Sequence, residues 1–229
     1  MNFSIESIPK DTASSMRAKN IWNEACPVTL EKLRLLKLTH YDFAGNLCAG
    51  EMIVHEKIAE ITISIFKELL TLKFPIEKIR LIDHYDGNDE LSMADNNSSC
   101  FNYRMIAGSE IVSMHACGLA IDINPVQNPY IIIPEIRHPE EHEVRRGDLL
   151  QLHEIAASPA APRNDAPCAQ VKIYPSAGKT YLNRANQRPG MLEPVVSIFT
   201  QHGLIWGGSW NSPIDYHHFQ VDRARLSEF

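Results

Sequence analysis

The chain has 229 residues, 44% of them hydrophobic and 22% charged, which suits one globular domain with a sizeable core. Its formal net charge of −6 and the lack of a basic run argue against a nucleic-acid partner, and no apolar stretch is long enough to span a bilayer. The five cysteines lack Cys-x-x-Cys spacing, which argues against a cysteine zinc site or a full disulfide framework. One bridge, from Cys26 to Cys48 or Cys100, stays open for an oxidising compartment.

We expect the first 27 residues to form an N-terminal lead-in segment and residues 28–229 to form the main domain. The lead-in is polar and has no continuous apolar core, so it does not read as a signal peptide. We expect it to be poorly ordered apart from a short helix over residues 14–24. Thr29 is then a suitable N-cap for a helix with leucines on one face. These leucines are Leu30, Leu33 and Leu36.

A hairpin and a long helix follow in the first half of the chain. Residues 38–43 and 47–54 predict two strands joined by a turn at residues 44–46. Residues 56–73 predict a helix that Pro75 ends, because apolar residues recur there at spacings of three and four. This apolar stripe consists of Ile58, Ile61, Ile65, Leu69 and Leu72.

The remaining elements are short. Residues 79–84 predict a strand, and residues 86–99, rich in Asp, Asn, Ser and Gly, predict a loop. A helix is expected over residues 192–202, followed by a strand at residues 204–206. Helices and strands are interspersed without regular β-α-β alternation, which indicates an α+β domain whose small, largely antiparallel sheet is flanked by helices.

Residues 113–124 contain a histidine and an aspartate around a glycine. Apolar residues alternate with small or polar ones from Leu119 to Ile123, the pattern of a strand with one buried face. Gly118 permits a tight turn before this strand, which would fold His115 back beside Asp122. An imidazole and a carboxylate placed in this way supply two of the three protein ligands of a catalytic zinc. If this stretch is considered alone, the alternative is that His115 is an ordinary surface or hydrogen-bonded histidine rather than a metal ligand.

A second stretch, Asp215-Tyr216-His217-His218-Phe219, offers a histidine to complete the ligand set, with a carboxylate three residues ahead. Neighbouring side chains on an extended segment point to opposite faces. His217 and His218 are therefore not expected to bind the same metal. We expect replacement of His217 to leave zinc and most activity in place.

Together the two stretches resemble the VanY-like zinc D-Ala-D-Ala carboxypeptidases and L-alanyl-D-glutamate endopeptidases. The motif Ser-x-His-x-x-Gly-x-Ala-x-Asp is followed in this family by an acidic-x-x-His motif, and both occur here in that order. The matching residues are Ser113, His115, Gly118, Ala120, Asp122, Asp215 and His218. The resemblance covers roughly residues 28–220 and includes residues 98–104, 124–130 and 206–208. It implies the fold shared with the hedgehog signalling domain.

The resemblance also implies the roles of the site residues. One Zn²⁺ would be held by His115, Asp122 and His218, leaving a position for a water whose pKa falls to ~7. Asp215 would take the proton of this water and pass it to the leaving amine. Arg104 would share the developing negative charge with the zinc. Ser113 would hydrogen-bond the substrate, or else simply cap a turn.

Residues 134–170 depart from the family. A Glu- and Arg-rich run is followed there by a segment with several prolines, which we interpret as an insertion bordering the cleft. Its histidines are read as surface residues rather than as metal ligands. They are His138, His142 and His153.

The substrate implied by the family is a stem peptide of peptidoglycan, and the protein is expected to be a monomer in the periplasm or outside the cell. No signal peptide is visible in the sequence. Either a signal peptide has been removed, or export uses another route, or the protein acts in another compartment. The sequence leaves open whether the enzyme trims a terminal D-Ala or cuts within the stem. Two other functions also stay open: a non-catalytic zinc-binding or signalling module, and a peptidase effector acting on another peptide.

Overall fold

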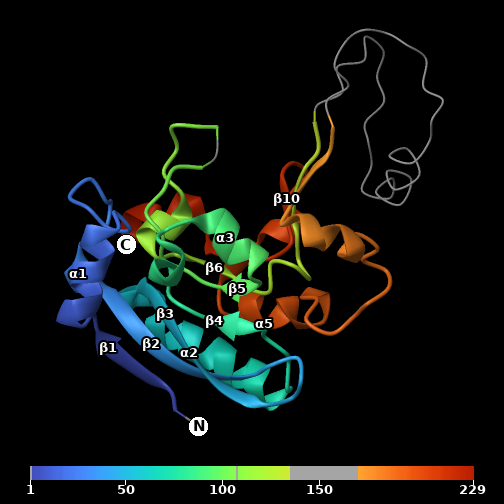
Figure 1. Ribbon diagram of the computed structural model, residues 1–229, viewed down its shortest axis with the longest axis horizontal. Helices are drawn as coiled ribbons and strands as arrows, with labels where there is room; N and C mark the ends of the chain where they lie inside the picture. The colour runs from blue at the N-terminus through green and yellow to red at the C-terminus, as the bar shows by residue number, and fades with distance from the viewer. Residues whose placement is uncertain (1, 107, 135–169) are drawn as a thin grey trace, which may run out of the picture.

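The computed structural model describes residues 2–106, 108–134 and 170–229 (Figure 1). The α-helices are α1 (Lys10–Ala18), α2 (Glu56–Thr71), α3 (Asp89–Ala94) and α5 (Val196–Gln201). The strands are β1 (Ser4–Ser7), β2 (Leu33–Tyr41), β3 (Leu47–His55), β4 (Lys78–Ile79), β5 (Asn97–Ser98), β6 (Ala120–Asp122), β7 (Tyr130–Ile132), β8 (Lys172–Tyr174), β9 (Leu204–Trp206), β10 (Ile214–Asp215) and β11 (His218–Val221). Short 3₁₀ helices are η1 (Leu30–Lys32), η2 (Ile82–Tyr85), η3 (Met114–Cys117), η5 (Ser176–Tyr181), η6 (Glu193–Val195), η7 (Gly207–Ser209) and η8 (Arg223–Glu228).

The strands of the described residues form several small sheets rather than the single sheet that the sequence predicts. Three sheets are antiparallel, with the orders β1-β2-β3, β10-β7-β8 and β6-β11-β9. A fourth sheet pairs β4 with β5 in parallel. The predicted α+β class, with mainly antiparallel strands, is confirmed. The strands are too short for one continuous sheet, so loops and 3₁₀ helices connect the pieces.

The predicted hairpin and long helix are both present. β2 and β3 pair from Leu33 to His55, and the Asp42 carboxylate accepts hydrogen bonds from the backbone of the intervening turn. The helix α2 follows directly, and the side chain of His55 caps it by accepting a hydrogen bond from the Lys57 N–H. Most of the predicted apolar stripe is buried, although Leu72, just after the last turn, is 61% exposed.

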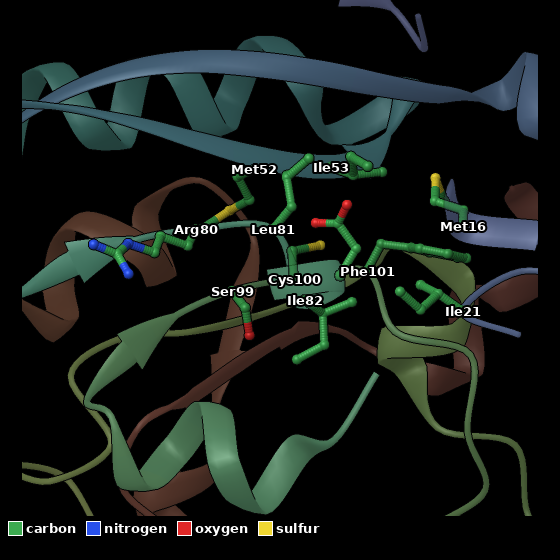
Figure 2. A pocket seen from close by; sticks show the side chains of 11 residues that line it. Met16, Ile21, Met52, Ile53, Arg80, Leu81, Ile82, Ser99, Cys100 and Phe101 are labelled. Carbon is green, nitrogen blue, oxygen red and sulfur yellow. The ribbon is translucent and has the colours of Figure 1, made fainter. Parts of the chain in front are cut away.

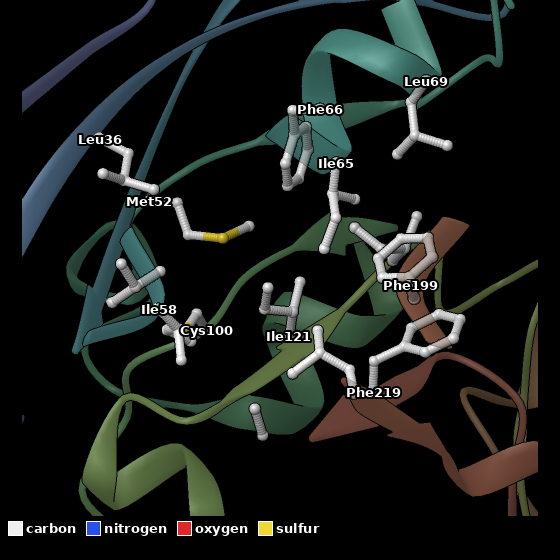
Figure 3. Packing of buried hydrophobic residues seen from close by; sticks show 14 of the residues in the cluster. Leu36, Met52, Ile58, Ile65, Phe66, Leu69, Cys100, Ile121, Phe199 and Phe219 are labelled. Carbon is white, nitrogen blue, oxygen red and sulfur yellow. The ribbon is translucent and has the colours of Figure 1, made fainter. Parts of the chain in front are cut away.

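The largest core cluster lies between α2 and the short strands of the second half (Figure 3). Ile121 of β6 is fully buried there, and the rings of Phe199 and Phe219 stack with their centroids 3.8 Å apart. Apolar burial of this kind contributes roughly 25 cal/mol per Å² and fixes β6 and β11 in place. The strands that carry the two sequence motifs are therefore anchored to the core.

The N-terminal segment differs from the predicted poorly ordered lead-in. β1 pairs with β2 in antiparallel register, and the helix lies at residues 10–18 rather than 14–24. Met16 and Ile21 are buried in a second core cluster together with Phe101, around the small cavity of Figure 2. Buried apolar side chains offset the conformational entropy lost on ordering this segment. Because most of the segment is polar, these few buried apolar residues gave no clear pattern in the sequence.

Two further elements differ from the sequence prediction. The helix predicted after Thr29 is only one 3₁₀ turn, and the strand β2 begins at Leu33. The leucines there are buried on both faces of this strand, rather than on one face of a helix. The predicted loop over residues 86–99 contains α3 and β5. The Asn88 side chain accepts a hydrogen bond from the Leu91 N–H and so caps the start of α3. Asparagine also favours turns, which explains why the sequence pattern indicated a loop.

The predicted insertion lies mostly outside the described residues. Its histidines and Cys168 are among the residues left undescribed, whereas its flanks, β7 and β8, pair as neighbouring antiparallel strands. The bridge from Cys26 that the sequence left open is not formed, since Cys26, Cys48 and Cys100 are all free thiols. No helix among the described residues is long and apolar enough to cross a membrane.

Candidate metal centre

The turn that carries His115 depends on a glycine. His115 lies in η3, and Gly118 ends this 3₁₀ helix in the left-handed conformation with a φ of +67°. The Gly118 carbonyl accepts a hydrogen bond from the His55 N–H, and a Cβ at position 118 would lie 2.7 Å from that nitrogen. Both the φ angle and the close approach therefore require glycine. As the sequence predicts, the turn brings His115 back beside Asp122.

The structure brings His115, Asp122 and His218 together. His218 on β11 is the register partner of Asp122 on β6, and its Nδ1 lies 3.0 Å from Asp122 Oδ1. His115 Nε2 lies 3.1 Å from Asp122 Oδ2 and 3.1 Å from His218 Nδ1. All three side chains are buried, and one donor atom of each lies within 4.8 Å of the others. Three donors that converge in this way could hold one metal ion.

Outer hydrogen bonds fix the tautomers of the two histidines. His115 Nδ1 lies 2.6 Å from the Cys100 carbonyl, which can only accept, so Nδ1 is the protonated nitrogen in a neutral ring. His218 Nε2 lies 2.9 Å from Gln220 Oε1 and donates to it. Each ring then turns an unprotonated nitrogen toward the shared point, the usual arrangement around a bound metal. Two neutral imidazoles and one carboxylate are a donor set that zinc accepts.

Charge within the site is tightly paired. Burial would raise the pKa of Asp122, but the neighbouring His115 and His217 hold that pKa well below its usual range. Burial lowers the pKa of His218, and the hydrogen bond and charge of Asp122 outweigh this effect and raise the pKa. Without a cation, a protonated His218 and an ionised Asp122 form an ion pair. A metal ion would displace the proton of that pair.

Asp215 lies beside this group but outside it. It ends β10 opposite Tyr130 of β7, and burial raises the pKa of its carboxyl, an effect that His217 and His218 partly offset. Gly207 packs against its backbone, where a Cβ would lie 2.7 Å from the Asp215 carbonyl oxygen. A buried carboxyl with a raised pKa is suited to accepting and returning a proton.

The segment around His217 is a turn rather than the extended strand that the sequence predicts. Tyr216 and His217 form a turn between β10 and β11, so the alternation of an extended strand does not apply. His217 Nδ1 donates to the Asn128 carbonyl at 2.7 Å, and Nε2 lies 3.1 Å from Asp215 Oδ1 and 3.8 Å from Asp122 Oδ2. His217 and His218 therefore both face the aspartates. Strand periodicity could not reveal this, because the turn has no glycine or proline to mark it.

The two remaining predicted residues have partners within the protein. Ser113 Oγ accepts a hydrogen bond from the His115 N–H at 3.3 Å and caps η3, which agrees with the turn-capping alternative. Arg104 pairs with Asp89 at 2.9 Å, and its carbonyl accepts a hydrogen bond from the Ser113 N–H. The pKa of the Tyr130 hydroxyl is raised by burial and then by Asp215, whereas Arg104 lowers it. Arg104 and Asp215 therefore act on the same tyrosine, with opposite effects on its pKa.

Trp206 and Trp210 have separate environments. The half-buried Trp210 ring lies 5.4 Å from the His218 ring and borders the site. The Trp206 indole donates to the Tyr216 carbonyl at 2.9 Å, and its ring packs against Phe219. Trp210 therefore borders the site, whereas Trp206 is partly buried and packs against the core.

A buried group of two histidines and one aspartate, beside a further carboxyl with a raised pKa, defines a metallohydrolase-type site on an α+β fold. A family model described as D-alanyl-D-alanine carboxypeptidase matches residues 107–221, half of the chain. The chain belongs to this family of zinc metallopeptidases. The matched residues include both motifs, whereas Arg104 lies before them. No curated protein and no solved structure gives a significant match.

Proposed function

We propose that this protein is a zinc peptidase that hydrolyses stem peptides of peptidoglycan, with one zinc per chain held by His115, Asp122 and His218. The observation that carries the proposal is the convergence of their donor atoms within 4.8 Å, with both imidazole tautomers set by outer partners. Membership of the D-alanyl-D-alanine carboxypeptidase family supports the substrate class.

The chemistry follows from the donor set and its neighbours. A zinc ion bound there would supply Lewis acidity and lower the pKa of a coordinated water to ~7. Asp215 is the proposed general base, and its buried carboxyl would take a proton and return it to the leaving amine. The site is buried, so each of these interactions would act in a low-dielectric environment that strengthens it.

Arg104 and Ser113 are the proposed substrate-binding residues. The guanidinium of Arg104 would exchange its partner Asp89 for a substrate carboxylate or for the developing oxyanion. Ser113 Oγ accepts a hydrogen bond from the His115 N–H, which leaves its own proton for donation to the substrate. A serine that caps η3 can in this way also bind the peptide.

The substrate places the proposed activity outside the cytoplasm, in the periplasm or beyond the cell, and we propose that the enzyme acts as a monomer. The fold would be the one shared with the hedgehog signalling domain. Cleavage of a terminal D-Ala is the proposed reaction, because the family description names that activity. Cleavage within the stem is the alternative that product analysis decides.

The test is hydrolysis of defined stem peptides, with and without a terminal D-Ala-D-Ala, by the zinc-loaded protein, with products identified by mass. We expect release of one D-Ala from the longer peptide and no reaction after chelation of the metal. Cleavage between L-alanine and D-glutamate would assign the endopeptidase reaction. Stoichiometric zinc without hydrolysis of any stem peptide would contradict the proposal and leave a zinc-binding module or a peptidase of other peptides.

A further inference from the structure

The two proposed substrate-binding residues, Arg104 and Ser113, lie at the base of a short hairpin. Its arms, residues 104–106 and 111–113, project from the body of the protein (Figure 1). The arms are joined by an antiparallel bridge between Met105 and Val112, by a hydrogen bond from the Ile106 N–H to the Ile111 carbonyl, and by one from the Ser113 N–H to the Arg104 carbonyl. Arg104 is therefore directly opposite Ser113, and the two isoleucines are directly opposite each other.

This pairing puts the isoleucines on the same face of the hairpin as the substrate-binding residues. Side chains alternate between the two faces of a strand, so residues two positions apart share a face. Ile106 therefore shares a face with Arg104, and Ile111 shares the same face with Ser113. The bridged pair between them lies on the opposite face. The isoleucines thus continue the proposed substrate-binding face, at about 7 Å from Arg104 along the arm.

Both isoleucines are exposed, and the hairpin holds them in place. Ile106 is 37% exposed and Ile111 is 53% exposed. Opposite side chains on paired strands have Cβ atoms about 4.5–5.5 Å apart, so the two form one apolar surface. Ser109 Oγ donates to the Ile106 carbonyl at 3.1 Å and accepts from the Ile111 N–H at 3.2 Å, which ties the two arms together near the tip. The ion pair between Arg104 and Asp89 fixes the base.

We propose that Ile106 and Ile111 form an apolar subsite for the side chain of the C-terminal residue of the peptide substrate. The α-carbon that bears the terminal carboxylate also bears this side chain. A carboxylate bound by Arg104 therefore places the side chain within about one residue length of the guanidinium, beside the isoleucine pair. The subsite favours a hydrocarbon over a hydroxyl, which would lose water there without gaining a hydrogen-bond partner. The inference rests on the proposed function in assigning Arg104 to a substrate carboxylate.

Two peptides of nearly the same size test the proposal. D-α-aminobutyrate and D-serine, each in place of the last D-Ala of a stem peptide, differ only in a methyl group and a hydroxyl. We expect the wild-type kcat/KM to be roughly 3–10-fold higher for the aminobutyrate peptide. Ile106→Thr and Ile111→Thr should each bring this ratio closer to one, while keeping the branched Cβ that suits a strand. Met105→Thr is the matched control, because Met105 is 46% exposed on the opposite face, and it should keep the wild-type ratio.

The ratio is taken within each variant, so a partial loss of folded protein cancels. An unchanged ratio in both isoleucine variants would overturn the inference, as would an equal fall in Met105→Thr.

Binding without turnover separates this inference from the proposed function. Calorimetric titration of zinc-loaded Asp215→Asn with the two peptides should give a Kd roughly 3–10-fold lower for the aminobutyrate peptide, and added Ile106→Thr should remove the difference. Equal Kd values for the two peptides in Asp215→Asn would overturn the inference even if the wild type hydrolyses stem peptides. Failure of the wild type to cleave any stem peptide would instead contradict the proposed function, and the binding comparison would then decide the inference.

Discussion

His218 Nδ1 lies 3.0 Å from Asp122 Oδ1, although 96 positions separate the two residues in the chain. They are register partners on β11 and β6, and side chains directly opposite each other on paired strands have Cβ atoms about 4.5–5.5 Å apart. Strand pairing therefore brings two of the proposed ligands together. His115 comes from a separate turn, which Gly118 fixes to the end of β3.

Loss of one ligand should remove the metal. We expect His115→Ala to lower the zinc content and abolish hydrolysis together, because three protein ligands are the minimum for such a catalytic site. Elemental analysis and a stem-peptide assay measure the two effects. His84→Ala is the matched control, since His84 is exposed and lies outside the site. Full zinc occupancy in His115→Ala would disprove the assignment.

Asp215→Asn should separate zinc binding from catalysis. The amide keeps the shape of the side chain but cannot act as a base, so kcat should fall by ~10²–10⁴ while zinc content stays at the wild-type level. His218→Ala should lose both zinc and activity. Loss of zinc from Asp215→Asn would mean that Asp215 is a ligand, and the proposed division of roles would be wrong.

Arg104→Lys should reduce kcat/KM roughly 100-fold, because lysine keeps the charge but lacks the planar fork that binds a carboxylate or an oxyanion. Asp89→Asn is the control, since it removes the 2.9 Å ion pair while leaving the guanidinium free for substrate. We expect this control to retain kcat/KM. An equal decrease in both variants would indicate that the arginine acts only through its pair with Asp89.

His40 should make the stability of the protein depend on pH. It is 3% exposed, and neither ring nitrogen has a hydrogen-bond partner among the described residues. Burial lowers its pKa to about 4, against ~6.5 in an unfolded chain, although Asp42 opposes the shift. As the pH falls from ~6.5 to ~4, the unfolded chain takes up a proton that the folded protein does not. Stability is therefore lost over that range.

Urea unfolding across this pH range measures the effect. One proton corresponds to a slope of about 1.4 kcal/mol per pH unit in the free energy of unfolding. His40→Phe should remove this component, whereas His84→Phe, at an exposed position, should keep it. Identical slopes for His40→Phe and the wild type would show that other groups cause the acid sensitivity.

Replacing residues 135–169 with a short Gly-Ser linker should leave the fold and the zinc content intact. The flanking strands β7 and β8 already pair, with Ile132 opposite Lys172, so a short connection can join them. The proposed ligands all lie outside the segment. We expect substrate preference to change more than zinc affinity, since loops at a site carry specificity. Loss of cooperative unfolding would instead place the segment in the core.

Several parts of the fold followed from local patterns in the sequence. The stripe of isoleucine and leucine identified α2, because a helix repeats every 3.6 residues and one face must be buried. The turn around Gly45 identified the β2–β3 hairpin. The helix predicted from Leu30, Leu33 and Leu36 was wrong, since a strand that is buried on both sides has no polar face to reveal its period.

The sequence by itself determined the candidate ligands, because the spacing around Gly118 and the acidic-x-x-His motif are local features of the chain. Only the tertiary structure decided how their environment is arranged. Cys100, Gln220 and Asn128 each bond to a histidine of the site, and two of these partners are distant in sequence. Such contacts depend on packing between separate elements and leave no periodic signal in the sequence. The direction of His217 was decided in the same way, by a turn and a distant carbonyl.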